Sequence, residues 1–301
     1  MINEYILIYW LTIYDCNINE LIMIKVYVSI LLIALLSLLT LVSGDILMFW
    51  LFLELCSLSM VPCLLQCSKV NVGDSLLSYI FAISIASSLM LVGLLYCDFF
   101  FFFFVGFMVK FGVFPFIIWV YSVFNNSCSW VVCWCISILM KISLLSVSYF
   151  VYGLDSFVFS LCIVLGLFFS GLMFWLYTIN WFSAWTHMVV SSSGIMIYML
   201  SLLGVDDFIF MFVLYMVWGS GVILYFGVFN GFIGYLMWLI SVPFSFSFIY
   251  KAVCTYYLVG LGFYVLLFWF VYCFLEQLYL FKWLASGHVV KSVWFRGLLS
   301  W

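Results

Sequence analysis

The sequence has 301 residues, of which 70% are hydrophobic and 6% are charged, and its formal net charge is −3 at pH 7. A soluble domain needs far more polar surface than this composition provides, and the eight lysines and arginines are too few for a nucleic-acid-binding surface. Apolar runs long enough to cross a bilayer as helices recur along the whole chain. The composition therefore predicts an all-α polytopic membrane protein with about ten transmembrane helices in contact with lipid.

The apolar runs divide the chain into three parts. Residues 1–25 are expected to form an N-terminal interfacial segment, because their apolar run Tyr5–Tyr14 is too short to span a bilayer. Residues 26–276 form the membrane domain, and residues 277–301 form a cationic C-terminal tail. The expected spans lie at 26–44, 46–66, 75–96, 99–122, 128–152, 156–178, 181–203, 208–229, 232–256 and 257–276.

If the chain crosses the membrane once at each of these ten spans, the charged residues between the spans fall on opposite sides of the membrane according to their sign. The cations on one side are Lys25, Lys69, Lys282, Lys291 and Arg296, and the acids on the other are Asp45, Asp98, Asp155, Asp206 and Asp207. An error of one span would scramble this partition. The positive-inside rule predicts that the cationic side is the side on which the protein is synthesised.

The fourth span contains both a charge and a helix breaker. Lys110 lies within the apolar run Phe99–Tyr121, and Pro115 follows it. A lysine at the bilayer centre costs at least about 2.5–3.5 kcal/mol on insertion scales. Pro115 cannot donate to the carbonyl of Phe111, so we expect a break there, with protein or water around the freed backbone groups. A buried charge beside a helix break predicts an ion or proton path.

The ten spans also divide into two halves of five. The fourth span of the second half repeats the pattern with Pro243 and Lys251. Because each half has an odd number of spans, the halves would form two inverted five-helix repeats. Broken helices at matching places in inverted repeats point to a transport site, so breaks are expected near Pro115 and Pro243.

Four charged residues lie near the middle of predicted spans, each on a different helix. They are Glu54, Lys110, Lys141 and Lys251. A row of such groups with water between them can pass protons as each group changes its charge in turn. The alternative is structural: a static ion pair, with the remaining lysines extending along their helices to place their charges at the membrane interface.

His187 is a further candidate because its surroundings are polar in an otherwise apolar chain. Ser183, Thr186 and the run Ser191–Ser193 lie close to it in sequence. One interpretation is a proton relay through the imidazole. The alternative is packing, since serines also hydrogen-bond between membrane helices that have no transport role.

The residue types that bind cofactors show no recognisable pattern. Most of the eleven cysteines lie in apolar segments, where they behave as small hydrophobic residues, and Cys133 and Cys135 lack metal-ligand spacing. No glycine-rich phosphate loop, haem motif or nucleophile–base pair is present. We therefore expect no metal, nucleotide, flavin or haem on this chain.

The coding bias and the N-terminal sequence indicate the compartment in which the protein is made. Phe, Trp and Cys are abundant while Pro and His are scarce, which indicates a T- and G-rich coding strand such as a compact organelle genome has. The N-terminus shows no Arg-rich transit peptide. Both features are typical of a protein made inside the organelle whose membrane it enters.

The fourth span resembles the signature of a known family. Residues 110–120 read K-x-G-x-x-P-F-x-x-W-V, which is similar to the KxGxxPFHxWxP signature of the antiporter-like membrane subunits of respiratory complex I. Ile117 replaces the histidine of that signature, and Tyr121 and Ser122 replace a Pro-Glu pair. These substitutions would affect the water and the helix break near Pro115 more than they would affect the row of charged residues.

Three further segments resemble subunit 2 of NADH dehydrogenase within that family. They are Leu53-Glu54 with Pro62, FSAWTHM at 182–188, and Pro243 with Phe248 and Lys251, which are similar to LE…P, YSSIAHM and PPxSGFxxK. Lys141 falls about where the mid-chain lysine of that subunit would be. The resemblance covers roughly residues 26–275.

The resemblance implies a function and a role for each charged residue. The chain would be a core membrane subunit of the respiratory-chain NADH:ubiquinone oxidoreductase, a translocase in the mitochondrial inner membrane, and would pump protons. Glu54 would pair with Lys110, and Lys141 would be the central relay. Lys251 would be the exit site, with His187 between it and Lys141.

The same resemblance implies the partners. NADH, FMN, iron–sulfur clusters and ubiquinone would bind to partner subunits, and the direct contacts would be other complex I membrane subunits. Three alternatives stay open at this point: another antiporter-like subunit of complex I, a stand-alone cation/proton antiporter, and a structural subunit that does not pump.

Overall fold

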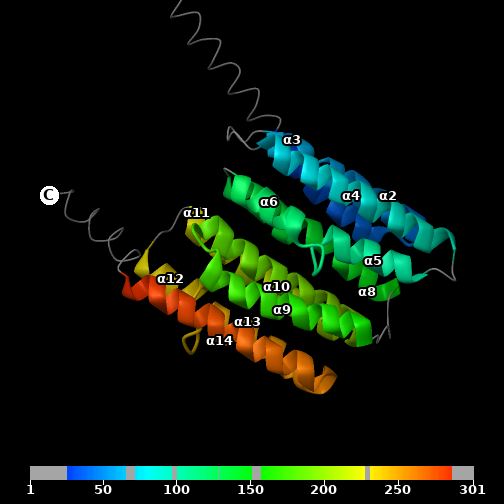
Figure 1. Cartoon of the computed structure of the whole chain (residues 1–301). Helices are drawn as coiled ribbons and strands as arrows, with labels where there is room; N and C mark the ends of the chain where they lie inside the picture. Colours follow the sequence, from blue (N-terminus) through cyan, green and yellow to red (C-terminus); the bar gives the residue numbers. More distant parts are fainter. Residues whose placement is uncertain are drawn as a thin grey trace, which may run out of the picture.

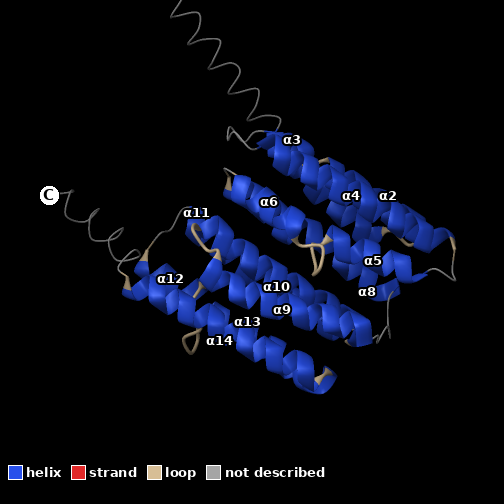
Figure 2. Ribbon diagram, viewed as in Figure 1, coloured by secondary structure: helices blue, strands red, loops and turns tan. Residues whose placement is uncertain are grey.

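The computed structural model describes residues 26–65, 72–96, 100–127, 129–150, 157–227 and 231–286. These residues form helices joined by short loops, with no strand among them (Figure 2). The expected interfacial segment 1–25 and most of the expected C-terminal tail lie outside the described residues. The all-α prediction is confirmed for the part of the chain that is described.

The described chain runs back and forth through one bundle (Figure 1). Its helices group in chain order into ten rods, where a rod is one helix or a set of consecutive helices separated by a short break. The rods are Val26–Val42; α2 (Ile46–Leu58) with α3 (Val61–Leu65); α4 (Val72–Leu95); α5 (Phe100–Lys110) with α6 (Ile118–Asn126); α7 (Trp130–Trp134) to α8 (Ser143–Phe150); α9 (Phe157–Leu176); α10 (Trp181–Leu202); α11 (Val205–Gly227); α12 (Phe232–Trp238) with α13 (Phe246–Leu261); and α14 (Phe263–Ala285). The rods correspond in order to the ten expected spans. They are not ten continuous helices, because four of the rods are broken.

The first rod and the sixth rod begin at opposite ends of the bundle, as inverted repeats require (Figure 1). Among the described residues, six helical stretches are long and apolar enough to cross a membrane. They are Ile46–Leu65, Val72–Leu95, Trp130–Ser148, Phe159–Leu176, Val205–Gly227 and Phe263–Ala285. Together with the shorter apolar helices, they make the chain a multi-pass membrane protein.

The boundary between the last two rods differs from the expected one. The sequence pattern places it between residues 256 and 257, whereas α13 continues to Leu261 and α14 begins at Phe263. Gly262 forms the turn in an extended conformation. No polar residue marks this turn, so hydropathy alone misplaced it. As a result α14 continues past residue 276, the expected end of the membrane domain, to Ala285.

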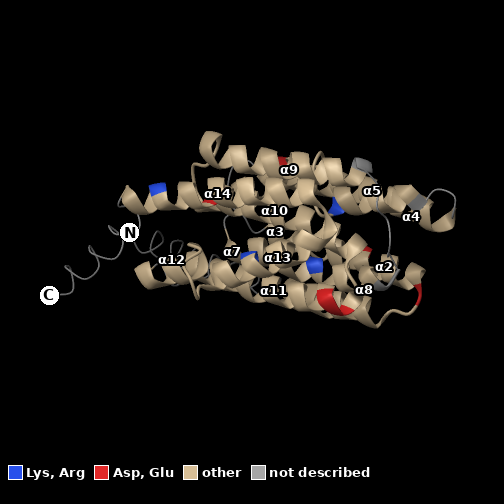
Figure 3. Cartoon of the chain, turned by 90° about the horizontal axis from the view of Figure 1, so that it is seen from below, with Lys and Arg blue, Asp and Glu red and all other residues tan. Residues whose placement is uncertain are grey.

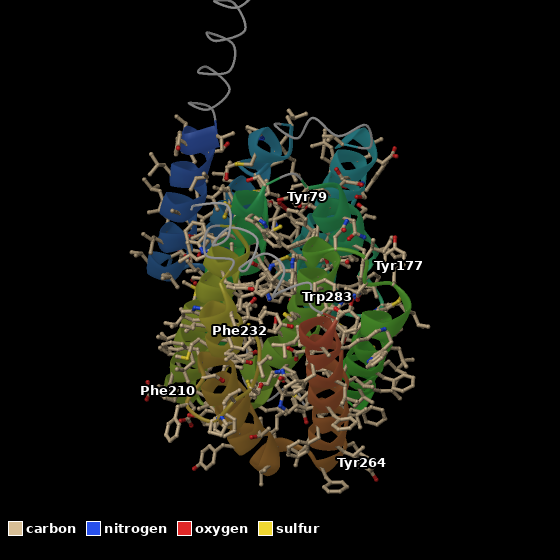
Figure 4. All side chains as sticks on the ribbon, turned by 90° about the vertical axis from the view of Figure 1, so that its left-hand side faces the viewer. Tyr79, Tyr177, Phe210, Phe232, Tyr264 and Trp283 are labelled. Carbon is tan, nitrogen blue, oxygen red and sulfur yellow. The ribbon has the colours of Figure 1, made fainter. Side chains whose placement is uncertain are left out.

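The centre of the bundle is α10, which is buried along almost its entire length. It packs against α6, α8, α9, α11 and α13. Its serines and Gly194 keep its surface small, which allows close approach between membrane helices. Large side chains such as Phe210 and Tyr264 instead lie on the outside of the bundle (Figure 4), where they are 54% and 77% exposed and can face lipid.

The expected break at Pro115 lies between α5 and α6. Here α5 ends at Lys110, and Gly112 follows with a φ of 63°, in the left-handed region that favours glycine. The indole Nε1 of Trp119 donates to the carbonyl of Val109 at 2.9 Å. A side chain thus satisfies a backbone acceptor at the break, as the interior of a membrane protein requires.

The second expected break, near Pro243, separates α12 from α13. The backbone N–H of Ser241 donates to Oε1 of Gln277 at 2.9 Å, and the amide of Gln277 donates to the carbonyl of Leu239 at 3.3 Å. The hydroxyl of Ser245 caps α13 by accepting from the N–H of Phe248. The last rod, α14, therefore holds this break in place.

The charges at the rod ends can be compared in the described residues. Asp206 and Asp207 lie in the first turn of α11, and Lys282 lies in the last turn of α14. These two turns are at opposite ends of the bundle, in agreement with the expected partition (Figures 1 and 3). Six further charges of that partition lie outside the described residues: Lys25, Lys69, Asp98, Asp155, Lys291 and Arg296.

The break at Gly112 can be tested by replacing the glycine. We expect Gly112→Ala to lower the stability of the purified protein by about 1–2 kcal/mol, because an alanine strains the left-handed backbone; a Cβ there would also meet the side chain of Val120. Heat inactivation should then occur roughly 2–8 °C lower. The control is Gly260→Ala on α13, where a Cβ meets open space. Equal melting of the two variants would contradict the strain argument.

Candidate functional site

Charged residues on five rods are buried or half-buried in the bundle. They are Glu54 on α2, Lys110 at the end of α5, Lys141 between α7 and α8, Lys251 on α13 and Glu276 on α14. Lys110 is 4% exposed, Lys141 2%, Lys251 7% and Glu276 1%. Charged groups this deeply buried require partners, so their contacts define the site.

Glu54 and Lys110 form a loose ion pair. The Nζ of Lys110 lies 3.5 Å from Oε2 of Glu54. It also donates to the carbonyl of Leu53 at 3.2 Å and to the hydroxyl of Ser57 at 3.4 Å. The hydroxyl of Ser57 lies 3.1 Å from the same carboxylate oxygen of Glu54. Ser57 therefore connects the two charged groups.

Sequence reasoning missed Ser57. Its signal was present, because a residue three positions after Glu54 faces the same side of a helix. A second residue, Tyr79 on α4, supports this position: its hydroxyl donates to the carbonyl of Ser57 at 2.9 Å, and its side chain lies inside the bundle (Figure 4).

A small cavity separates Lys110 from Lys141. It has a volume of about 10 Å³, roughly the smallest space that holds one water molecule. Both lysines line it, together with Phe111, Trp119, Val120, Ile136, Met140 and Val189. A second cavity of about 10 Å³ is also lined by Lys110, together with Ser37, Thr40 and Ser143. Two water-sized spaces thus adjoin Lys110.

Lys141 lies at an irregularity in its rod that the sequence did not predict. A π-helical turn at Cys135–Leu139 is followed by a 3-10 turn at Met140–Ile142. Such π turns are frequent at functional sites. Lys141 donates to the hydroxyl of Tyr215 at 2.9 Å and to that of Ser192 at 3.4 Å. Its ammonium group therefore ends on neutral hydroxyls inside the protein and not at a membrane interface.

Aromatic side chains connect Lys141 to the helix that carries Lys251. The rings of Tyr215 and Tyr250 are 5.9 Å apart, and Tyr250 precedes Lys251 on α13. The hydroxyl of Tyr215 also donates to the carbonyl of Ser137 in the π-helical turn at 2.9 Å. Tyr215 on α11 and Ser192 on α10 thus connect the central lysine to the second half of the bundle.

Lys251 forms a second ion pair that was not predicted. Its Nζ lies 2.8 Å from Oε2 of Glu276 on α14. Sequence reasoning missed Glu276 because it placed the end of the last span at residue 276, where an acid is unremarkable. Recognising Gly262 as the turn would have shown Glu276 to be in the middle of a helix from Phe263 to Ala285.

His187 on α10 contacts an aromatic residue from each of two other rods. Nδ1 of its imidazole shares a hydrogen bond with the hydroxyl of Tyr121 at 2.6 Å, and its ring packs on Phe174 at 5.0 Å. In the described contacts it touches neither Lys141 nor Lys251. It is completely buried, and its role stays a prediction.

The fold is similar to that of a known membrane protein. The chain resembles a chain of respiratory complex I from Thermus thermophilus, solved with bound aureothin, with a TM-score of 0.69 and 16% sequence identity. The alignment covers 85% of this chain and 69% of that chain. At this identity the likeness establishes a shared fold. No model of a protein family and no curated protein matches the sequence.

The coupling of Glu54 to Lys110 can be measured by a double-mutant comparison. Glu54→Gln alone should impair assembly, because it leaves a buried lysine without its counter-charge, a change that costs up to about 3–5 kcal/mol. Glu54→Gln combined with Lys110→Met should assemble better than Glu54→Gln alone, as seen on native gels. Additive losses in the double variant would contradict the pairing.

Proposed function

We propose that this chain is a proton-translocating membrane subunit of respiratory complex I, of the subunit 2 type. The observation that carries the proposal is the row from the Glu54–Lys110 pair through Lys141 to Lys251, inside a fold shared with a complex I chain. The subunit 2 type is supported by the sequence segments around Glu54, His187 and Lys251.

The row has the physical properties that proton transfer needs. Each buried lysine is costly in a membrane protein, so three of them favour a function over packing alone. Lys110 and Lys141 share a cavity of water size, and Lys141 contacts the hydroxyl of Tyr215. Hydroxyls and water both accept and donate protons, so they can link groups that do not touch.

The redox chemistry would take place on partner subunits and not on this chain. NADH oxidation and ubiquinone reduction, with FMN and iron–sulfur clusters, would take place on partner subunits, and this chain would move protons in response. Its partners would be other membrane subunits of the complex. The coding bias supports the mitochondrial inner membrane as its location.

Two alternatives make different experimental demands. A stand-alone cation/proton antiporter would exchange Na⁺ or K⁺ for protons when the purified chain alone is placed in vesicles. A complex I subunit would instead co-migrate on native gels with an assembly that oxidises NADH. Co-migration without exchange activity supports the proposal, and the opposite result contradicts it.

Lys141 is the sharpest test of pumping within such an assembly. Lys141→Ala should lower proton pumping and coupled quinone reduction by about tenfold or more, while the complex still assembles. Lys141→Arg should be equally defective, because arginine cannot release its proton.

The matched control is Lys282→Ala, which removes an exposed lysine at the end of α14 that lies 5.1 Å from the ring of Trp175. We expect normal pumping from it. Normal pumping in assembled complexes that carry Lys141→Ala would instead favour a structural subunit.

A further inference from the structure

The Lys251–Glu276 pair differs from the Glu54–Lys110 pair in its geometry. Its two charged atoms are 2.8 Å apart, compared with 3.5 Å in the first pair. A separation of 2.8 Å brings the two charged atoms into direct contact as an ion pair, although Nζ of Lys251 makes no hydrogen bond among the described residues. Glu276 is 1% exposed, so its carboxylate is held in the protein interior.

The order of the rods makes Glu276 the counterpart of Lys141. Lys110 and Lys251 lie on the fourth rod of their halves, whereas Lys141 and Glu276 lie on the fifth. The fifth rod therefore carries a base in the first half and an acid in the second. Lys141 meets neutral hydroxyls, but Lys251 meets an opposite charge supplied by the same chain.

We propose that Glu276 is the proton-exchanging partner of Lys251, and that the two residues together form the terminal site of the row. The proposal rests on the proposed function and deepens it. It replaces a single exit lysine with an acid–base pair.

The transfer within this pair is balanced. One proton leaves the ammonium of Lys251 and binds Oε2 of Glu276, so an ion pair becomes a neutral amine and a neutral carboxylic acid. The net charge of the site stays at zero, which avoids leaving an isolated charge in a medium of low dielectric constant. The acid then releases its proton to water, and Lys251 takes the next proton from the row.

Two observations position Glu276 for this step. Its second carboxylate oxygen, Oε1, is buried and has no hydrogen-bond partner among the described residues, so it is open to a water molecule. The next residue, Gln277, hydrogen-bonds to Ser241 and Leu239 in the break between α12 and α13. A movement of that break would therefore change the position of the carboxylate.

The experiment compares variants in the whole complex, reconstituted in vesicles, with the ratio of protons pumped to NADH oxidised as the readout. Glu276→Gln should lower this ratio by about tenfold or more, while Glu276→Asp should keep part of it. Asp207→Asn is the control, because it removes an exposed carboxylate from the first turn of α11. It should leave the ratio unchanged.

A second variant covers the case in which Glu276→Gln does not assemble. Glu276→Gln with Lys251→Met removes both charges, so the complex should assemble but not pump. Normal pumping in either assembled variant, or equal loss from Glu276→Asp and Glu276→Gln, would overturn the proposal. If Lys141→Ala also pumps normally, the proposed function fails with it. If Glu276→Gln pumps normally but Lys141→Ala does not, the proposed role of the Lys251–Glu276 pair is wrong and the proposed function of the chain stands.

Discussion

The burial of charge is the constraint on which the rest of this structure depends. An isolated ion in a medium of low dielectric constant is strongly destabilised, so each buried lysine must meet an opposite charge or oxygen acceptors. Lys110 meets Glu54 and Ser57, Lys141 meets hydroxyls, and Lys251 meets Glu276. The helices that carry these partners come from both halves of the chain, so satisfying the charges also packs the bundle.

The broken helices follow from the same constraint. A continuous helix hides its backbone groups, whereas a break exposes them and needs side chains to satisfy them. Trp119 does this at the first break, and Gln277 does it at the second. The charged residues lie next to these irregularities: Lys110 ends α5, and Lys141 lies in a 3-10 turn after a π turn. Two of the buried lysines thus lie at or beside irregular backbone.

Much of the site could be predicted from residue type and position. Glu54, Lys110, Lys141 and Lys251 stand out because charge is rare in this chain, and the two proline breaks follow from the missing N–H. Ser57 and Glu276 were missed for different reasons. A serine in a membrane helix has many uses, so its chemistry is not distinctive. Glu276 was hidden by a misplaced turn at Gly262, where no polar residue interrupts the apolar pattern.

The sequence by itself determined the helical class, the order of the ten rods and which residues carry charge, because apolar length, proline and rare polar groups act locally. Apart from the expected Glu54–Lys110 pair, only the tertiary structure decided the partners. That Lys251 contacts Glu276, that Lys141 ends on Tyr215, and that His187 contacts Tyr121 depend on how distant helices pack. Which side chains meet across two rods depends on how each rod is rotated about its axis and shifted along it. The hydrophobicity pattern of a single helix determines neither the rotation nor the shift.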